Sequence, residues 1–132
     1  MKYGIVTAIF TKNYRIIKNI INNKDLTSLF KTYNNKIDLI DTAPSYGNAE
    51  KILGINKNKE LKIVTKIDKI IDKKNIIKEF NVGLKKSLKN LKSKKIYCLM
   101  LHQETDIYLF KKSEFKKEIL ELKKRGIIKK IG

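Results

Sequence analysis

"IDLIDTAPSYGNAEKILG", residues 37–54, is the stretch that decides the fold of this 132-residue chain. Its apolar start over 37–40 is typical of a buried strand. The strand ends on Asp41, and Tyr46 follows in a turn before a helix-like segment that Gly54 is expected to close. A carboxylate at the end of a buried strand is costly unless a partner balances its charge. The pattern therefore predicts a polar site at the carboxyl end of a parallel strand.

Two further apolar runs also end on an ionisable residue. The run over 61–66 ends on Lys66, and the run over 96–101 is followed by His102, the only histidine of the chain. Near-continuous apolar strands separated by helical patterns indicate a parallel sheet covered by helices. A single strand-ending lysine is usually solvated, and a lone histidine is more often structural. Three such ends with Tyr46 beside them indicate catalysis, because functional side chains of βα barrels come from this rim.

The remaining pattern gives an α/β fold of four βα-type units in sequence. Apolar spacing and turn residues predict strands over 37–41, 61–66, 96–101 and 127–131, and helices over 25–34, 48–53, 76–92 and 113–125. Asn75 and Ser113 are the expected caps of the last two helices, and Gly126 is the expected stop of the last one.

Four segments follow one another in a recognisable order: "DTAPSYGNAEKILG", "IVTK", "SLKNLKSKKIYCLMLH" and "LKKRGIIKKIG". They resemble the aldo-keto reductase family, in which such segments carry an aspartate and a tyrosine, a lysine, a histidine, and the next helix and strand. The resemblance runs from about Asp25 to Gly132. It implies a (β/α)8 TIM barrel, and residues 1–132 are interpreted as one incomplete domain of that kind.

Carried over residue by residue, the family's catalytic tetrad falls on Asp41, Tyr46, Lys66 and His102. Reduction of a carbonyl by hydride leaves charge on the oxygen, and the resemblance makes Tyr46 the proton donor. A nearby Lys66 ammonium would favour the phenolate form. Asp41 would keep Lys66 charged and oriented, and His102, as a neutral donor, would hydrogen-bond the substrate carbonyl.

The resemblance also implies an oxidoreductase that uses NADPH, with NADH as the alternative, on a small aldehyde or ketone. Beyond Asp41, no cofactor-binding residue is carried over, because most such positions follow the last residue of this chain. No metal site is expected, since the single cysteine, Cys98, lies in an apolar strand and gives no ligand spacing. We expect it to pack as a small apolar residue.

The chain is too short for a complete barrel of this family. A barrel of this kind takes about 250 residues, so we expect a partial barrel, truncated after about the fifth strand, that is inactive by itself. At the amino end, the glycine-rich turn of the family is missing. Either the first strand is lost, which we favour, or "YGIVTAIF" (3–10) substitutes for it. Residues 13–23 are read as either a short helix or a basic segment.

The basic composition of the chain suggests an alternative to the reductase function. The net charge is +18, with 29 lysines and two arginines spread along the whole chain. Nucleic-acid sites tend to concentrate charge and to use arginine, so no specific nucleic acid is expected, only salt-sensitive attraction to polyanions. A noncatalytic basic half-barrel that binds a partner or polyanion is the second hypothesis. No apolar run reaches a membrane-spanning length and no signal peptide begins the chain, so a cytoplasmic location is expected. Oligomeric state is not indicated.

Overall fold

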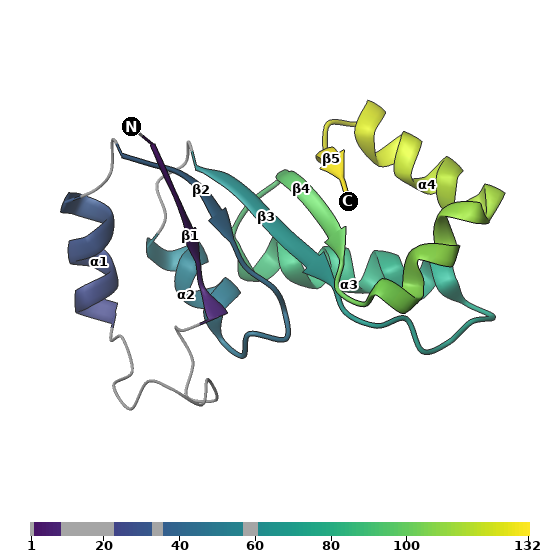
Figure 1. Ribbon diagram of the computed structural model, residues 1–132, viewed down its shortest axis with the longest axis horizontal. Helices are drawn as coiled ribbons and strands as arrows, with labels where there is room; N and C mark the ends of the chain where they lie inside the picture. Colours follow the sequence, from purple (N-terminus) through teal and green to yellow (C-terminus); the bar gives the residue numbers. More distant parts are fainter. Residues whose placement is uncertain (1, 9–22, 33–35, 57–60) are drawn as a thin grey trace.

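The computed structural model describes residues 2–8, 23–32, 36–56 and 61–132 (Figure 1). Its elements in chain order are β1 (Tyr3–Val6), α1 (Asn23–Thr32), β2 (Ile37–Asp41), α2 (Ala49–Asn56), β3 (Lys62–Ile67), α3 (Ile76–Asn90), β4 (Ile96–Leu101), the 3-10 helix η2 (Glu104–Lys111), α4 (Ser113–Lys124) and β5 (Ile128–Ile131). Within these residues the strands form one five-stranded sheet in the order β1-β2-β3-β4-β5. The predicted α/β class is therefore confirmed.

Every pair of neighbouring strands is parallel. Each strand lies beside the strand that follows it in sequence, and Figure 1 shows α2 and α3 along one side of the curved sheet. Parallel strands in sequential order, each joined to the next by a helix on the same side, are the repeating unit of a βα barrel. The five strands thus form a partial barrel, as predicted.

The main core lies between the sheet and its helices. Ile40 and Leu99 on the strands and Leu84 on α3 are buried there, and the rings of Phe80 and Phe115 meet edge to face with centroids 5.1 Å apart. This aromatic pair joins α3 to α4. The apolar spacing that predicted α3 is therefore the spacing of its buried face.

The favoured prediction that the first strand is lost is wrong. Residues Tyr3–Val6 form β1, which pairs in parallel with β2 from Tyr3 opposite Ile37 to Val6 opposite Asp41. The backbone N–H of Thr7 donates to the Asp41 carbonyl at 2.9 Å, and the buried hydroxyl of Thr7 bonds that of Thr42 at 2.8 Å. Hydrogen bonds from the strand end thus hold β1 without a glycine-rich turn. Residues 9–22, with most of the 13–23 segment, lie outside the described residues.

The predicted helix ends are partly right. Gly126 does stop α4: its φ is +67°, and the N–H groups of Gly126 and Ile127 donate back to the last turn at 3.0 and 2.9 Å. Ser113 is not a cap but the first helical residue, preceded by Lys112. Asn75 occupies the N-cap position of α3, but its side chain donates to Asp72 at 2.8 Å instead of capping the helix.

Gly54 does not close α2, which continues to Asn56. A Cβ placed on Gly54 would lie 2.2 Å from the carbonyl oxygen of Asn90 and 2.8 Å from the carbonyl carbon of Leu91. This glycine therefore permits the close approach of α2 to the end of α3 rather than a turn.

A buried carboxylate joins the same two helices to the sheet. Glu50 on α2 is 1% exposed, and its two oxygens accept hydrogen bonds from the hydroxyl of Thr65 on β3 at 2.8 Å and the amide of Asn90 on α3 at 3.1 Å. Because both oxygens have donors, the cost of burying the group is offset. The contact fixes β3 one residue before Lys66.

Candidate active site

The register of the sheet brings the predicted side chains to one rim. Asp41 pairs with Val64, so Lys66 lies two residues further along β3; Lys66 pairs with Met100, so His102 lies two residues further again. This stagger follows from the tilt of strands in a barrel. Asp41, Lys66 and His102 are therefore at the carboxyl ends of three adjacent strands, as predicted.

Lys66 forms the centre of the site. Its Nζ donates to Oδ1 of Asp41 at 2.5 Å and to the backbone carbonyl of Thr42 at 3.1 Å. The Lys66 side chain is 13% exposed and that of Asp41 is 27% exposed. A largely buried ammonium needs a countercharge and hydrogen-bond acceptors, and both are supplied by the end of β2.

Tyr46 is held beside this pair by the turn between β2 and α2. The turn is closed by hydrogen bonds from the Tyr46 N–H to the Ala43 carbonyl and from the Ala49 N–H to the Tyr46 carbonyl, both at 3.1 Å. The centroid of the Tyr46 ring is 5.2 Å from Nζ of Lys66, and 6.0 Å from that of the His102 ring, which it meets edge to face. The structure thus brings all four predicted residues together; their catalytic roles remain predictions.

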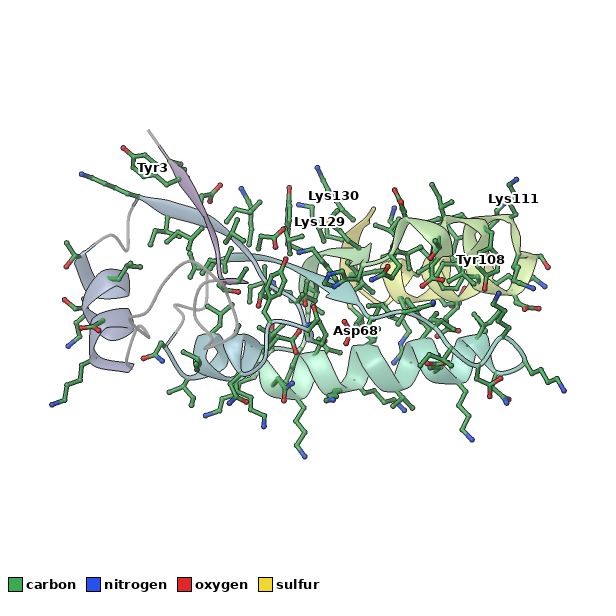
Figure 2. All side chains as sticks on the ribbon, turned by 60° about the horizontal axis from the view of Figure 1, so that its bottom comes forward. Tyr3, Asp68, Tyr108, Lys111, Lys129 and Lys130 are labelled. Atoms are coloured by element: carbon green, nitrogen blue, oxygen red, sulfur yellow. The ribbon has the colours of Figure 1, made fainter. Side chains whose placement is uncertain are left out.

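Two residues of the site were missed by the sequence reasoning. Oγ of Ser45 lies 3.2 Å from Nδ1 of His102, and Oδ1 of Asp68 lies 3.7 Å from the same nitrogen. Figure 2 shows Asp68 beyond the arrowhead of β3. Both residues are sequence neighbours of predicted ones, Ser45 of Tyr46 and Asp68 of Lys66, but no residue pattern distinguishes them from ordinary loop residues.

The described residues suit one end of a nicotinamide dinucleotide. A carboxylate, an ammonium, a phenol and a hydroxyl gather at the carboxyl ends of β2 and β3 and in the loop after β2, and hydrogen-bonding groups of these kinds fit the polar amide of a nicotinamide. We assign no described residue to the phosphates or the adenine. Within the described residues, no group of three His, Cys, Asp or Glu side chains could hold a metal ion.

Comparison with known proteins identifies the family. The model of the "Aldo/keto reductase family" matches residues 19–132, which is most of the chain. The chain therefore belongs to the aldo/keto reductase family. A comparison with curated proteins found no match.

Solved structures agree with this assignment. A presumed aldo-keto reductase from Pseudomonas aeruginosa has 25% identity and a TM-score of 0.78, over 98% of this chain and 53% of that one. An aldo-keto reductase from Klebsiella pneumoniae in complex with NADPH has 20% identity and a TM-score of 0.71, over 98% and 43%. A glycerol dehydrogenase from Gluconobacter oxydans has 22% identity and a TM-score of 0.70, over 98% and 43%.

The chain thus spans about half the length of the solved structures that it resembles. The last two, being less than 25% identical, support the fold alone. Within the described residues, no helix has the length and apolarity needed to cross a membrane.

Proposed function

We propose that this chain carries the catalytic residues of an NAD(P)H-dependent reductase of aldehydes or ketones, with Tyr46 as the proton donor. The observation that carries the proposal is the position of the Lys66 ammonium, bonded to Asp41 and 5.2 Å from the centre of the Tyr46 ring. NADPH is the preferred cofactor, since family members have been crystallised with NADPH and NADP, and NADH is the alternative.

When bound, the nicotinamide supplies the hydride. The residues of this chain then act on the oxygen atom of the carbonyl. Negative charge develops on its oxygen, and the Tyr46 hydroxyl provides a proton there, which is general acid catalysis. Lys66 stabilises the phenolate that remains, and Asp41 holds the ammonium in place. The His102 ring meets the Tyr46 ring edge to face, with centroids 6.0 Å apart, so we assign His102 to orienting the carbonyl.

The test is the Tyr46→Phe substitution, made in a complete barrel. This barrel is a chimera in which the carboxyl-terminal half of the Klebsiella pneumoniae enzyme follows residue 132. We expect carbonyl-dependent NADPH consumption to fall by about 10²–10⁴-fold, the usual contribution of a general acid. Tyr108→Phe is the matched control, because its buried hydroxyl, which lacks a partner among the described residues, lies on η2 outside the site.

Retention of full activity by Tyr46→Phe would reject the role of the phenol. Residues 1–132 alone are expected to show no saturable NADPH binding at the candidate active site, because we assign no described residue beside Tyr46 and Lys66 to the phosphates of the cofactor. Tight binding by the isolated chain, measured by quenching of NADPH fluorescence, would contradict this expectation.

A separate part of the structure supports a second function. Leu61–Ile63, Tyr97 and Lys129 are among the residues that line a hollow of about 680 Å³ at the amino ends of β3, β4 and β5, the opposite end of the strands from the candidate active site. The ammonium groups of Lys62, Lys129 and Lys130 lie 5.5–5.8 Å from the centroid of the Tyr97 ring. Figure 2 shows Lys129 and Lys130 beside each other.

Two of these three lysines have no carboxylate partner within the described residues. Lys62 bonds Asp38 at 2.7 Å, and that hydrogen bond raises the pKa of Lys62. Within the described residues, no carboxylate pairs with Lys129 or Lys130. Because like charges repel, an anion of several phosphates would relieve the cluster. We therefore propose weak binding of a phosphate polyanion as the second function.

The experiment for this second function compares two double variants with the same net charge. Lys129→Glu with Lys130→Glu changes the cluster, and Lys116→Glu with Lys117→Glu changes two exposed lysines of α4. We expect the first pair to weaken binding of a fluorescent polyphosphate by about tenfold more than the second. Equal losses in both would mean that the attraction comes from the overall charge, and the site would be rejected.

A further inference from the structure

The turn that carries Tyr46 is bonded to β3 at both of its ends. At its start, the backbone N–H of Thr42 donates to the Val64 carbonyl at 2.9 Å. At its end, the buried carboxylate of Glu50 accepts a hydrogen bond from the Thr65 hydroxyl at 2.8 Å. Since the next residue of β3 is the lysine of the candidate active site, these two bonds tie the segment of the phenol to the strand of the ammonium.

Glu50 does not reach the reacting groups itself. It is 1% exposed and lies on α2, which packs on the helical side of the sheet (Figure 1). Successive residues of a strand point to opposite faces of the sheet, so Thr65 points towards Glu50 and Lys66 points towards Asp41 on the other face. Any effect of Glu50 on catalysis must therefore pass through the positions of β3 and of the Tyr46 turn.

A carboxyl group is costly to bury in this place. Within the described residues, no ammonium or guanidinium forms an ion pair with Glu50, whose oxygens accept from the neutral hydroxyl of Thr65 and the neutral amide of Asn90. An apolar side chain of similar size would fill the same space without the desolvation cost. The need to fill space therefore does not explain Glu50, whereas two acceptor oxygens between α2, β3 and α3 do.

We propose that Glu50 is a positioning residue, which holds the Tyr46 ring and the Lys66 ammonium at their working separation. The ammonium lies 5.2 Å from the ring centroid. A displacement of about 1 Å among reacting groups can slow catalysis by about 10²-fold, so a bond next to Lys66 and at the end of the Tyr46 turn has a large effect on rate. The effect on reduction rests on the proposed function, whereas the effect on the separation does not.

The proposal assigns this effect to hydrogen bonds rather than to the charge of Glu50. Glu50→Gln keeps an acceptor oxygen for Thr65, and its amide can donate to Asn90 once the Asn90 amide turns over and presents its oxygen. Thr65→Ser keeps the hydroxyl. Both conservative variants should therefore preserve the separation. Glu50→Ala and Thr65→Val remove the bond between α2 and β3 and should not preserve it.

The separation can be measured without cofactor or turnover. Nuclear Overhauser contacts between the ε-methylene protons of Lys66 and the ring protons of Tyr46 report it directly in residues 1–132. We expect these contacts in the unaltered chain, in Glu50→Gln and in Thr65→Ser. We expect their loss in Glu50→Ala and in Thr65→Val.

Glu118→Ala is the matched control. Glu118 on α4 also accepts a hydrogen bond from an asparagine of α3, Asn81, at 2.9 Å, but this bond joins α4 to α3 and leaves β3 untouched. The control therefore removes the same type of side chain and the same type of bond. It should keep the contacts between Lys66 and Tyr46.

The consequence for catalysis is measured in the chimeric barrel. We expect kcat for carbonyl reduction to fall by about 10²-fold in Glu50→Ala and by about tenfold in Thr65→Val, with the KM of the carbonyl changed by less than about twofold. This split is expected because the bond positions the groups that transfer the proton and does not contact the substrate. Glu50→Gln, Thr65→Ser and Glu118→Ala should keep kcat within about threefold of the unaltered barrel.

Several outcomes would overturn the proposal. They are contacts that are absent from the unaltered chain, contacts that persist in both Glu50→Ala and Thr65→Val, and a loss in Glu50→Gln as large as in Glu50→Ala. If Glu50→Ala does not fold, Thr65→Val decides, because it changes the shape of the side chain least. Failure of Thr65→Val to fold would also reject the proposal, since a bond that only positions two side chains should not decide folding.

The two readouts separate this proposal from the proposed function. Contacts that change as expected, together with an unaltered chimeric barrel that does not reduce carbonyls, would reject the reductase and keep the positioning role of Glu50. An active barrel whose kcat does not respond to Glu50→Ala or Thr65→Val would do the reverse.

Discussion

Substitution of Gly54 by alanine tests the packing that places α2, and with it the turn of Tyr46. The added methyl group would lie 2.2 Å from the Asn90 carbonyl oxygen and 2.8 Å from the Leu91 carbonyl carbon, and both are backbone atoms. Ordinary van der Waals contact begins near 3.4 Å, so the two helices would have to separate by about 1 Å. Since a backbone cannot swing aside as a flexible side chain does, the helix end itself must move.

The magnitude follows from two opposing effects. Alanine is favoured over glycine inside a helix by about 1 kcal/mol, and overpacking of a filled site costs about 1–3 kcal/mol or more. A backbone collision belongs at the upper end of that cost, so we expect Gly54→Ala to destabilise the chain by about 2 kcal/mol or more. Gly83→Ala on α3 is the matched control: its Cβ would meet only Ile67 side-chain atoms, at 3.6 and 4.0 Å. That variant should gain about 0.5–1 kcal/mol.

The assay is urea-induced unfolding of the two variants and the unaltered chain, followed by circular dichroism at 222 nm. The same chemical change in two helices should move the midpoint in opposite directions. A Gly54→Ala variant as stable as Gly83→Ala would refute the close approach of α2 to the end of α3.

Two further predictions concern pKa values. The hydrogen bond from Lys62 lowers the pKa of Asp38 below the ordinary 3.8, so the stability that this pair contributes is present at higher pH and is lost as the pH falls below that value. In a plot of the urea midpoint against pH, Asp38→Asn should therefore make the fall on the acid side less steep. An unchanged plot would speak against the pair. Burial raises the pKa of the Cys98 thiol, although the positive charge of Lys130 acts in the opposite direction. Alkylation of Cys98 by iodoacetamide at pH 8 should therefore be at least about tenfold slower in the native chain than in urea. Equal rates would contradict a protected thiol.

The sequence predicted those parts of the fold that depend on local periodicity. The end of β2 at Asp41 was found, and the end of β3 was found to within one residue of Lys66, because an apolar run ending on a charge is visible in the residues themselves. The helix α3 was found because its buried face repeats every three or four residues. The position of each strand in the barrel then followed from the order of the strands along the chain.

Features that depend on contacts between distant segments were not predictable in this way. The β1 strand is short and largely exposed, and hydrogen bonds to β2 hold it rather than any pattern of its own. The η2 segment was not predicted, because a buried Asp106 that accepts from the Ile70 N–H at 3.2 Å holds it in place. Ser45 and Asp68 became site residues only when the fold placed both against Nδ1 of His102.

The central claim is that Lys66 links Asp41 to Tyr46 in a site for carbonyl reduction. The most direct test is Lys66→Met in a complete barrel, with Lys69→Met, an exposed lysine three residues on, as the control for lost charge. With NADPH and a set of small aldehydes and ketones, we predict that kcat falls by at least about 10²-fold for Lys66→Met and is unchanged for Lys69→Met. Equal turnover by the two variants would contradict the account.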